Sequence, residues 1–370
     1  MNPTETPSDP GAQTELHRRI QAAIVEAGGA IPFERFMELA LYEPGLGYYE
    51  RTPENVGKKG DFYTSVSVGP LFGELLAFHL LPTLESLVQT GPVEIVEAGA
   101  HDGRLTADLL GALDRFSPTL SGVVTARIVE PSPIRRRWQE SRLAPFTDRV
   151  RWSDGLPHRF RGVLVCNELL DAFPVERWRW RSTHGRWTKQ GVAAGTRGFH
   201  WVDLPDPAPE AWIPEPALAA VLPDGFARER CPAAAIWWSC ASEALEEGRL
   251  LTSDYGHADA SLPDPTRPEG TLRGYRKHRH VEDPLADAGE VDLTAHVDFA
   301  EVRRAGEAAG LSTLHDGAQS GFLVGVMKET LVAPDRFGVW DAARVRAFQT
   351  LTHPQHLGRA FRTLEQSRTV

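Results

Sequence analysis

Three residues in the stretch IVEAGAHDGRL, residues 95–105, have types and spacing suited to binding a nucleotide-like ligand. Glu97 ends an apolar run, Gly99 follows it, and Gly103 precedes a helical pattern. A glycine at a strand-to-helix turn lets a ligand approach the backbone closely, and the helix that follows offers unpaired N–H groups. The dinucleotide pattern G-x-G-x-x-G is not met. An acid at position 97 instead suits a cationic ligand portion, such as the amino group of S-adenosylmethionine (SAM), although a plain structural turn is an equal alternative.

Two further acids follow later strand-like runs. Glu130 ends the run VTARIVE, where a carboxylate can accept hydrogen bonds from both hydroxyls of a ribose. The alternative is an acid favoured near the N-terminus of the next helix. Asp154, in WSDGLP, could flank an adenine, or it could belong to an ordinary Asp-Gly turn.

The stretch VLVCNELLDAFPVERW places Asn167, Glu168 and Asp171 after a buried strand. Ligands bind at the carboxyl ends of parallel strands in open α/β sheets. Two carboxylates at that edge could hold a cationic acceptor. The competing interpretation is a helix cap made by Asn167, because asparagine is a favoured capping residue.

The elements that must position these residues alternate along the chain. Short apolar runs separated by helical patterns predict a parallel sheet covered on both faces, an α/β fold. We expect strands at 93–96, 124–130, 162–168, 249–256 and 321–329, and helices at 15–43, 69–88 (kinked or divided at Pro82), 104–116, 132–144 and 233–248. Residues 174–232 break the alternation with antiparallel patterns and several tryptophans, which favours an insertion with an aromatic core.

Composition limits the function classes. The chain has 370 residues, 41% hydrophobic, and a net charge of −10, which disfavours a nucleic-acid partner. The three cysteines lack CxxC spacing, which indicates a reducing compartment. No apolar run is long enough to predict a membrane span. The N-terminus is polar and shows no apparent secretory or mitochondrial targeting signal. We therefore expect a cytoplasmic protein that acts on neither nucleic acid nor membrane. The composition leaves the oligomeric state open.

Eight ordered blocks resemble one known family, the MidA-type SAM-dependent methyltransferases, whose mitochondrial members are protein arginine methyltransferases and assembly factors for respiratory complex I. The resemblance spans about residues 15–328. His101 stands where the family has a further glycine, and Val66 where it tends to have proline. The blocks are YEPGLGYYE, KGDFYTS, FGELLA, VEAGAHDGRLTADLL, CNELLDAFPVERW, SDYGH, GTLRGYRKHR and GEVDLTAHVDF.

The resemblance implies a class I methyltransferase (Rossmann-like) sheet with N-terminal helices and an inserted cap. The expected division is a disordered tail at 1–14, N-terminal helices and a ligand-closing loop at 15–90, a core at 91–173 and 233–330, a Trp-rich cap at 174–232, and a helical C-terminal extension at 331–370. The cofactor would be SAM, with S-adenosylhomocysteine as product and no metal. The implied cofactor positions are Gly60, Asp61, Thr64, Glu97, Gly99, Gly103, Glu130, Asp154 and Asn167.

The implied reaction is methyl transfer to arginine on a protein or peptide. A guanidinium stays protonated, so paired carboxylates would be needed to hold and orient it. Glu168 and Asp171 are the candidates, with Asp254 and His296 behind them; a structural histidine is the alternative at 296. Two other functions stay open: methylation of a small-molecule or peptide oxygen or nitrogen, and a non-catalytic assembly or binding factor that keeps the fold.

Overall fold

The computed structural model describes residues 10–50, 64–196, 198–209, 212, 214–260, 263–276, 279–353, 357–358 and 360–369, with side chains from residue 15 onward. The chain divides into two compact units. Unit 1 comprises residues 1–52, 172–233 and 260–296, and unit 2 comprises residues 53–171, 234–259 and 297–370. All but one of the predicted site residues belong to unit 2.

Unit 2 is built on an eight-stranded sheet with the order β15-β16-β10-β5-β2-β3-β4, and the short strand β14 also pairs with β10. Strands β4, β3, β2, β5 and β10 are parallel neighbours, whereas β16 runs antiparallel to both β10 and β15. The strands are β2 Glu94–Ala98, β3 Thr125–Val129, β4 Val150–Ser153, β5 Phe160–Asn167, β10 Leu245–His257, β14 Val297–Asp298, β15 Ser312–Ala318 and β16 Phe361–Arg368. Four of the five predicted strands are confirmed as the parallel strands β2, β3, β5 and β10.

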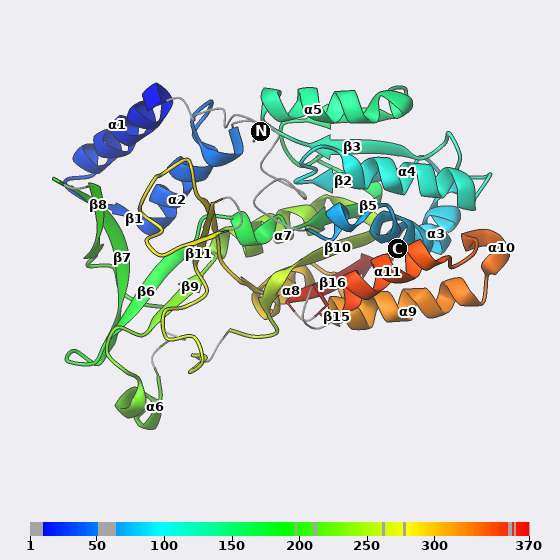
Figure 1. The fold of residues 1–370 in the computed structure, drawn as a ribbon. Coiled ribbons are helices and arrows are strands. Elements are labelled where there is room, and N and C mark those ends of the chain that lie inside the picture. The colour runs from blue at the N-terminus through cyan, green and yellow to red at the C-terminus, as the bar shows by residue number, and fades with distance from the viewer. Residues whose placement is uncertain are drawn as a thin grey trace. The chain divides into compact units, whose positions relative to one another are not determined.

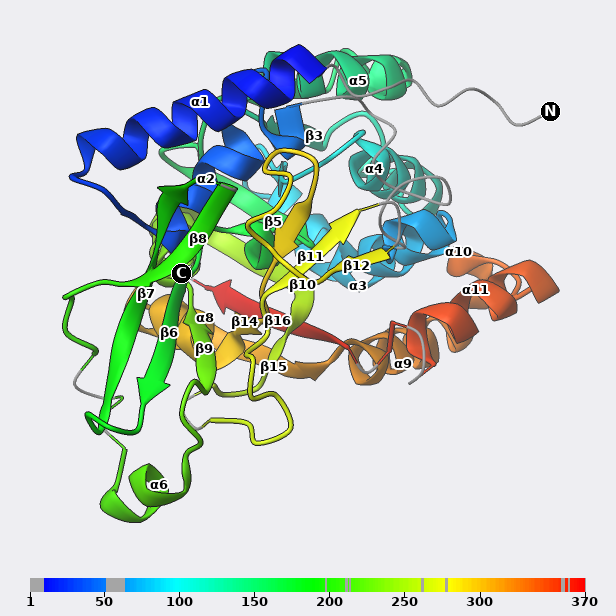
Figure 2. The same cartoon turned by 60° about the vertical axis from the view of Figure 1, so that its left-hand side comes forward.

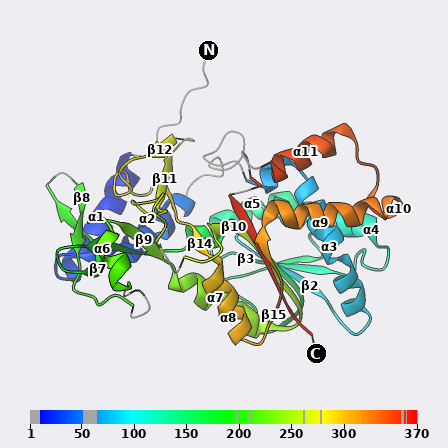
Figure 3. The same cartoon turned by 90° about the horizontal axis from the view of Figure 1, so that it is seen from below.

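Helices cover both faces of this sheet (Figures 1 and 3). Two consecutive residues of β16 show this, because successive side chains of a strand point to opposite faces. Glu365 accepts a hydrogen bond from His79 of α3, whereas Gln366 accepts one from Trp238 of α7. The helices are α3 Leu71–Val88, α4 Arg104–Phe116, α5 Pro133–Leu143, α7 Pro232–Ala244, α8 Phe299–Ala308, α9 Gln319–Leu331, α10 Pro334–Phe337 and α11 Ala342–Thr352.

Helix α3 continues through Pro82, so the expected division of the helix is wrong, while the alternative of a kink stays a prediction. Proline removes one backbone hydrogen bond, and burial of the helix among the core side chains of unit 2 offsets that loss. Among the residues that the structure describes, α3 is also the one helix long and apolar enough to cross a membrane by length and composition. Most of that stretch is buried inside unit 2, which is also what a core helix would show.

The sequence interpretation of the C-terminal part was wrong in two places. Residues 321–329, expected to be a strand, lie in helix α9, whose buried residues Phe322, Leu323, Val326 and Thr330 follow helical spacing. The region after 331 is not wholly helical, because β16 enters the middle of the sheet. Short apolar runs do not distinguish a strand from a buried helix.

Unit 1 combines α1 Pro10–Glu26 and α2 Phe33–Tyr42 with two antiparallel sheets (Figure 2). Helix α1 begins inside the tail expected to be disordered, and proline suits a first helical position. The predicted antiparallel pair at 176–195 is confirmed as β6 and β7, and Trp178, Trp180 and Trp187 form a buried cluster with Leu222 and Phe226. The strands are β1 Ile31–Pro32, β6 Glu176–Arg181, β7 Arg186–Gly195, β8 Gly198–Asp203 and β9 Ala227–Arg230 in one sheet, and β11 Arg273–Arg276, β12 Arg279–Val281 and β13 Asp292–Thr294 in the other; the helix α6 is Pro216–Val221.

Candidate cofactor and acceptor site

The carboxyl ends of the parallel strands of unit 2 lie in register. Ala98 of β2 pairs with Val129 of β3 and with Cys166 of β5, and Asn167 pairs with Ser253 of β10. The residues that follow these positions therefore share one edge of the sheet, the edge at which ligands bind in open α/β folds. This edge carries Gly99, Glu130, Asp154, Glu168 and Asp254.

The glycine turn after β2 is left-handed at three alternate positions. Gly99 has φ 74°, His101 has φ 46° and Gly103 has φ 81°. A Cβ at Gly99 would lie 3.0 Å from Leu169, and one at Gly103 would lie 2.9 Å from Leu143. The two glycines therefore allow the turn to pack between the β5 turn and helix α5.

His101 adopts the left-handed conformation that a glycine would take without steric cost. Its carbonyl oxygen accepts a hydrogen bond from Gln139 at 3.1 Å, and its ring lies 6.4 Å from that of Trp138. Burial, with the nearby positive charge of Arg135, lowers the pKa of His101 to about 4. The imidazole is therefore neutral at pH 7.

Glu97 lies beneath the glycine turn, 3% exposed. Its carboxylate accepts a hydrogen bond from the hydroxyl of Thr106 in the first turn of α4. Burial raises the pKa of Glu97 to about 7, although the hydrogen bonds from Thr106 act in the opposite direction. The predicted contact with a ligand amino group stays a prediction.

Glu130 is buried at the end of β3, and donors reach both of its carboxylate oxygens. The backbone N–H of Ser132 donates to Oε1 at 3.0 Å, and the side-chain amide of Gln139 donates to Oε2 at 3.0 Å. Asp154 is exposed by comparison and forms an ion pair with Arg136. The Nε–H of Arg136 also donates to the carbonyl of Glu130, so this arginine connects the two predicted positions.

The turn after β5 presents Glu168 in a left-handed conformation, with φ 52°. Its backbone N–H donates to the carbonyl of Ser253 at 2.9 Å, and its Oε1 accepts from the N–H of Ser65 at 3.2 Å and the amide of Asn167 at 3.0 Å. A non-glycine residue in this conformation is costly and persists where its surroundings determine it. Asp171 follows in the same turn and is buried.

Asp254, not Asn167, caps this turn. The Oδ2 atom of Asp254 accepts from the N–H groups of Leu169, Leu170 and Asp171 at 3.1, 2.8 and 3.3 Å. Burial raises its pKa to about 7 against the effect of these donors. The Oδ1 atom of Asn167 is buried and has no hydrogen-bond partner among the described residues.

The four remaining predicted positions are not shown to lie together with the residues described above. Gly60 and Asp61 lie outside the described residues. Thr64 lies in a turn closed by hydrogen bonds with Ser67. His296 belongs to unit 1. A guanidinium nitrogen of Arg267 lies 3.2 Å from the Nδ1 atom of His296, and the backbone N–H of His296 donates to the hydroxyl of Thr271.

The sequence interpretation missed Gln139 and Ser65, although each bonds a predicted carboxylate. The available signal for Gln139 was its spacing: it lies four positions before the apolar Leu143, and residues four apart share one face of a helix. Both residues are buried on α5. No such signal marked Ser65. Over the described part of the chain, no group of three or more His, Cys, Asp or Glu residues is arranged to hold a metal ion.

Comparisons with known proteins show which family the chain resembles. A family model described as S-adenosyl-L-methionine-dependent methyltransferase matches residues 75–316. A curated relative from Xenopus laevis, named protein arginine methyltransferase NDUFAF7, mitochondrial, is 26% identical over 91% of this chain and 81% of its own. The human protein of the same name is 26% identical over 82% of this chain and 70% of its own.

Two solved structures from Burkholderia thailandensis resemble the whole chain. One, bound to S-adenosyl-homocysteine, has a TM-score of 0.81 and 29% identity, and it matches over 99% of this chain and 95% of its own. The other, a native structure, has a TM-score of 0.80, 31% identity and the same coverage.

The comparisons contradict the expected cytoplasmic location, because the curated relatives are named as mitochondrial proteins. The expectation rested on cysteine usage and on the lack of an apparent signal. Cysteine usage separates oxidising from reducing compartments and nothing finer.

Proposed function

Because the chain belongs to the family of S-adenosyl-L-methionine-dependent methyltransferases, with a class I methyltransferase fold, we propose that it methylates an arginine side chain of a protein substrate. The names of the curated relatives support this acceptor. The single structural observation that carries the proposal is the turn after β5. There Glu168 is held in a costly left-handed conformation at the ligand-binding edge of the sheet.

The residues at this edge fit SAM. The left-handed glycine turn lies directly before α4, and Glu130 is a buried acceptor suited to ribose hydroxyls. The Oδ1 atom of Asn167 is an acceptor without a partner among the described residues, and an ammonium group could supply its donor. When bound, SAM supplies a methyl group on a positively charged sulfur, which a nitrogen displaces in line.

On this proposal, the carboxylates bind and orient the acceptor. Arginine presents a planar fork of N–H donors, which suits carboxylate acceptors. Glu168 and Asp171 would accept these N–H bonds and hold one nitrogen in line with the methyl group, and alignment of this kind lowers the barrier substantially. Asp254 already accepts several backbone N–H groups, so we assign it a positioning role. His296 stays a candidate proton acceptor.

The variant Glu168→Gln tests this assignment because it keeps the shape and removes the charge. We expect binding of S-adenosylhomocysteine to stay within a few fold, and the rate of methyl transfer to an arginine peptide to fall by about tenfold or more, the equivalent of one lost charged hydrogen bond. Glu94→Gln is the matched control. Glu94 pairs with Arg127 at the opposite end of β2, so its loss should leave transfer unchanged.

The outcomes separate the competing functions. If Glu168→Gln lowers the melting temperature and leaves turnover per folded molecule intact, Glu168 is only structural. Transfer to a neutral small molecule, but not to arginine peptides, would instead favour a small-molecule methyltransferase. Binding of SAM without any transfer would favour a non-catalytic factor.

A further inference from the structure

One buried amide connects three parts of the cofactor edge. Gln139 is 0% exposed on the inner face of α5. Its Nε2 atom donates to Glu130 Oε2 at 3.0 Å and to the carbonyl of His101 at 3.1 Å, and its Oε1 atom accepts from the indole N–H of Trp152 at 2.9 Å. These three partners lie after β3, in the glycine turn and on β4.

The contact with Glu130 fixes the direction of a carboxylate. The Ser132 N–H binds Oε1 and the Gln139 amide binds Oε2, so both oxygens of the carboxylate are held in place. A carboxylate held at both oxygens loses little freedom when it accepts ribose hydroxyls, because its orientation is set in advance. The amide of Gln139 also restrains the carbonyl of His101, a residue that adopts the left-handed backbone conformation at a steric cost.

We propose that Gln139 is a positioning residue for the ribose of SAM, acting through Glu130. The inference rests on the cofactor part of the proposed function and not on the identity of the methyl acceptor. Its consequence is specific: without the Gln139 donor, Glu130 no longer distinguishes a ribose from a 2′-deoxyribose.

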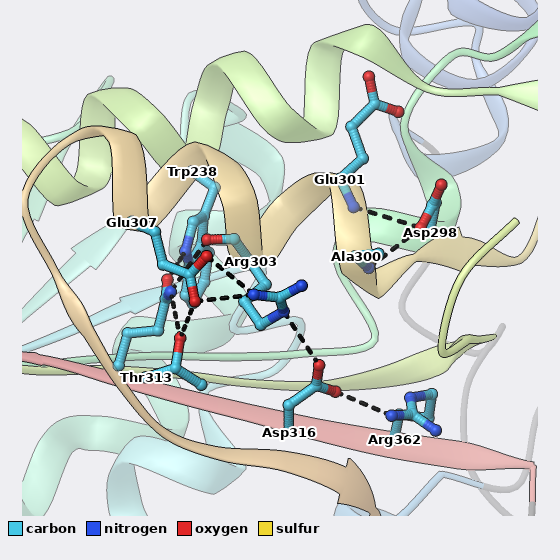
Figure 4. A network of polar contacts seen from close by, with 10 residues as sticks. Trp238, Asp298, Ala300, Glu301, Arg303, Glu307, Thr313, Asp316 and Arg362 are labelled. Atoms are coloured by element: carbon cyan, nitrogen blue, oxygen red, sulfur yellow. Dashed lines mark hydrogen bonds and ion pairs between the residues drawn. The ribbon is translucent and has the colours of Figure 1, made fainter. Parts of the chain in front are cut away.

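The chain contains a matched control. Gln366 of β16 is also 0% exposed, and its Oε1 atom accepts from the indole N–H of Trp238 at 2.7 Å. Its Nε2 atom donates to the carbonyl of Arg303 at 3.0 Å and to the hydroxyl of Thr313 at 2.9 Å. Figure 4 labels its partners Trp238, Arg303 and Thr313, which lie on α7, α8 and β15; like β16, these elements carry none of the predicted site residues. Both glutamines thus bridge an indole and a carbonyl, but only Gln139 contacts a predicted ligand group.

The test compares the variants Gln139→Met and Gln366→Met by calorimetry. The ligands are S-adenosylhomocysteine, 5′-methylthioadenosine and its 2′-deoxy counterpart. We expect the wild type to prefer the ribose ligand by roughly tenfold or more, as for a hydrogen bond to a charged acceptor. Gln139→Met should reduce this ratio to within about threefold, whereas Gln366→Met should keep the wild-type ratio even if its melting temperature falls.

A second variant covers the case in which Gln139→Met does not fold. Gln139→Leu removes the same donor with a shorter apolar side chain, so the same loss of ribose preference is expected. An unchanged ratio in a folded Gln139 variant would overturn the inference alone. A wild-type protein that does not bind S-adenosylhomocysteine would overturn the cofactor assignment with it, whereas a failure to methylate arginine would leave the inference standing.

Discussion

Two side chains at the cofactor edge occupy conformations that glycine adopts more readily. His101 and Glu168 have φ values of 46° and 52°, and they follow the neighbouring parallel strands β2 and β5. Each is held by buried hydrogen bonds, from Gln139 to the carbonyl of His101 and from Glu168 N–H to the carbonyl of Ser253. Backbone strain of this kind is concentrated at functional sites, which agrees with a ligand at this edge.

Glu97 makes the stability of the protein depend on pH. Its pKa is about 7 in the folded state and near 4.5 when exposed, because burial disfavours the charged form. The stabilisation from the protonated acid is fully present below about pH 4.5 and is lost as the pH rises through about 7. The loss is on the order of 3 kcal/mol, since one pKa unit corresponds to about 1.4 kcal/mol. Glu97→Gln should reduce the fall in unfolding free energy between pH 5 and 8.

Denaturant unfolding at several pH values measures this effect. Asp254 and Asp108 also have pKa values raised by burial, so part of the slope should persist in the Glu97→Gln variant. Identical pH slopes in the variant and the wild type would show that Glu97 is ionised in the folded protein.

At the scale of elements, two glycines in the parallel strands leave no room for a side chain beside the neighbouring strand. A Cβ at Gly162 of β5 would lie 2.0 Å from the carbonyl oxygen of Glu94 in β2, and a Cβ at Gly248 of β10 would lie 1.8 Å from the carbonyl oxygen of Gly162. The register confirms that the three residues are neighbours. Gly162 and Gly248 have φ values of 139° and 130°, which are unfavourable for residues other than glycine.

Gly162→Ala should therefore destabilise the protein by about 3 kcal/mol or more, because the new methyl group meets backbone atoms that cannot move aside. Gly111→Ala in helix α4 is the opposite control. Its Cβ would lie 3.8 Å from the nearest atom, and alanine favours a helix by about 1 kcal/mol. Melting temperatures should move in opposite directions, and a Gly162 variant as stable as the wild type would contradict the close strand approach.

How far the sequence predicts each element depends on its local pattern. Strand β2, which carries Glu97, and strands β3 and β5, which precede Glu130 and Glu168, were predictable, because short apolar runs alternate with clear helical periods. Helix α9 was misread as a strand, since a nine-residue apolar run fits either period. The role of Asp254 arises from its contact with Leu170, 84 positions away in the sequence, and no local pattern encodes such a contact. The pattern of α5 could mark Gln139 as buried but not Glu130 as its partner.

At the scale of the whole molecule, the predicted chemistry divides between the two units. Glu97, Glu130, Glu168 and Asp254 lie in unit 2, whereas His296 lies in unit 1. Net charge and composition could not specify this division, and cysteine usage with the lack of an apparent signal gave the wrong compartment. Ligand binding should therefore affect the two units differently.

S-adenosylhomocysteine at about 100 times its dissociation constant should stabilise the folded protein by about 2.7 kcal/mol. Hydrogen exchange should slow most at residues 94–110, 125–139 and 160–171, which surround the glycine turn, Glu130 and Glu168. Protection confined to β15 and β16 would place the ligand elsewhere on unit 2. Protection confined to unit 1 would contradict the proposed site.

The position of β16 has a consequence for synthesis. This strand follows α9, α10 and α11 along the chain, yet it separates β10 from β15 in the sheet. A nascent chain on the ribosome can form the parallel strands early, but β15 finds its partner only after these three helices and then β16 have been translated. Until then, the uncovered edge of β10 is a surface for chaperones and proteases, and a premature stop codon before Phe361 would leave the sheet open at that edge.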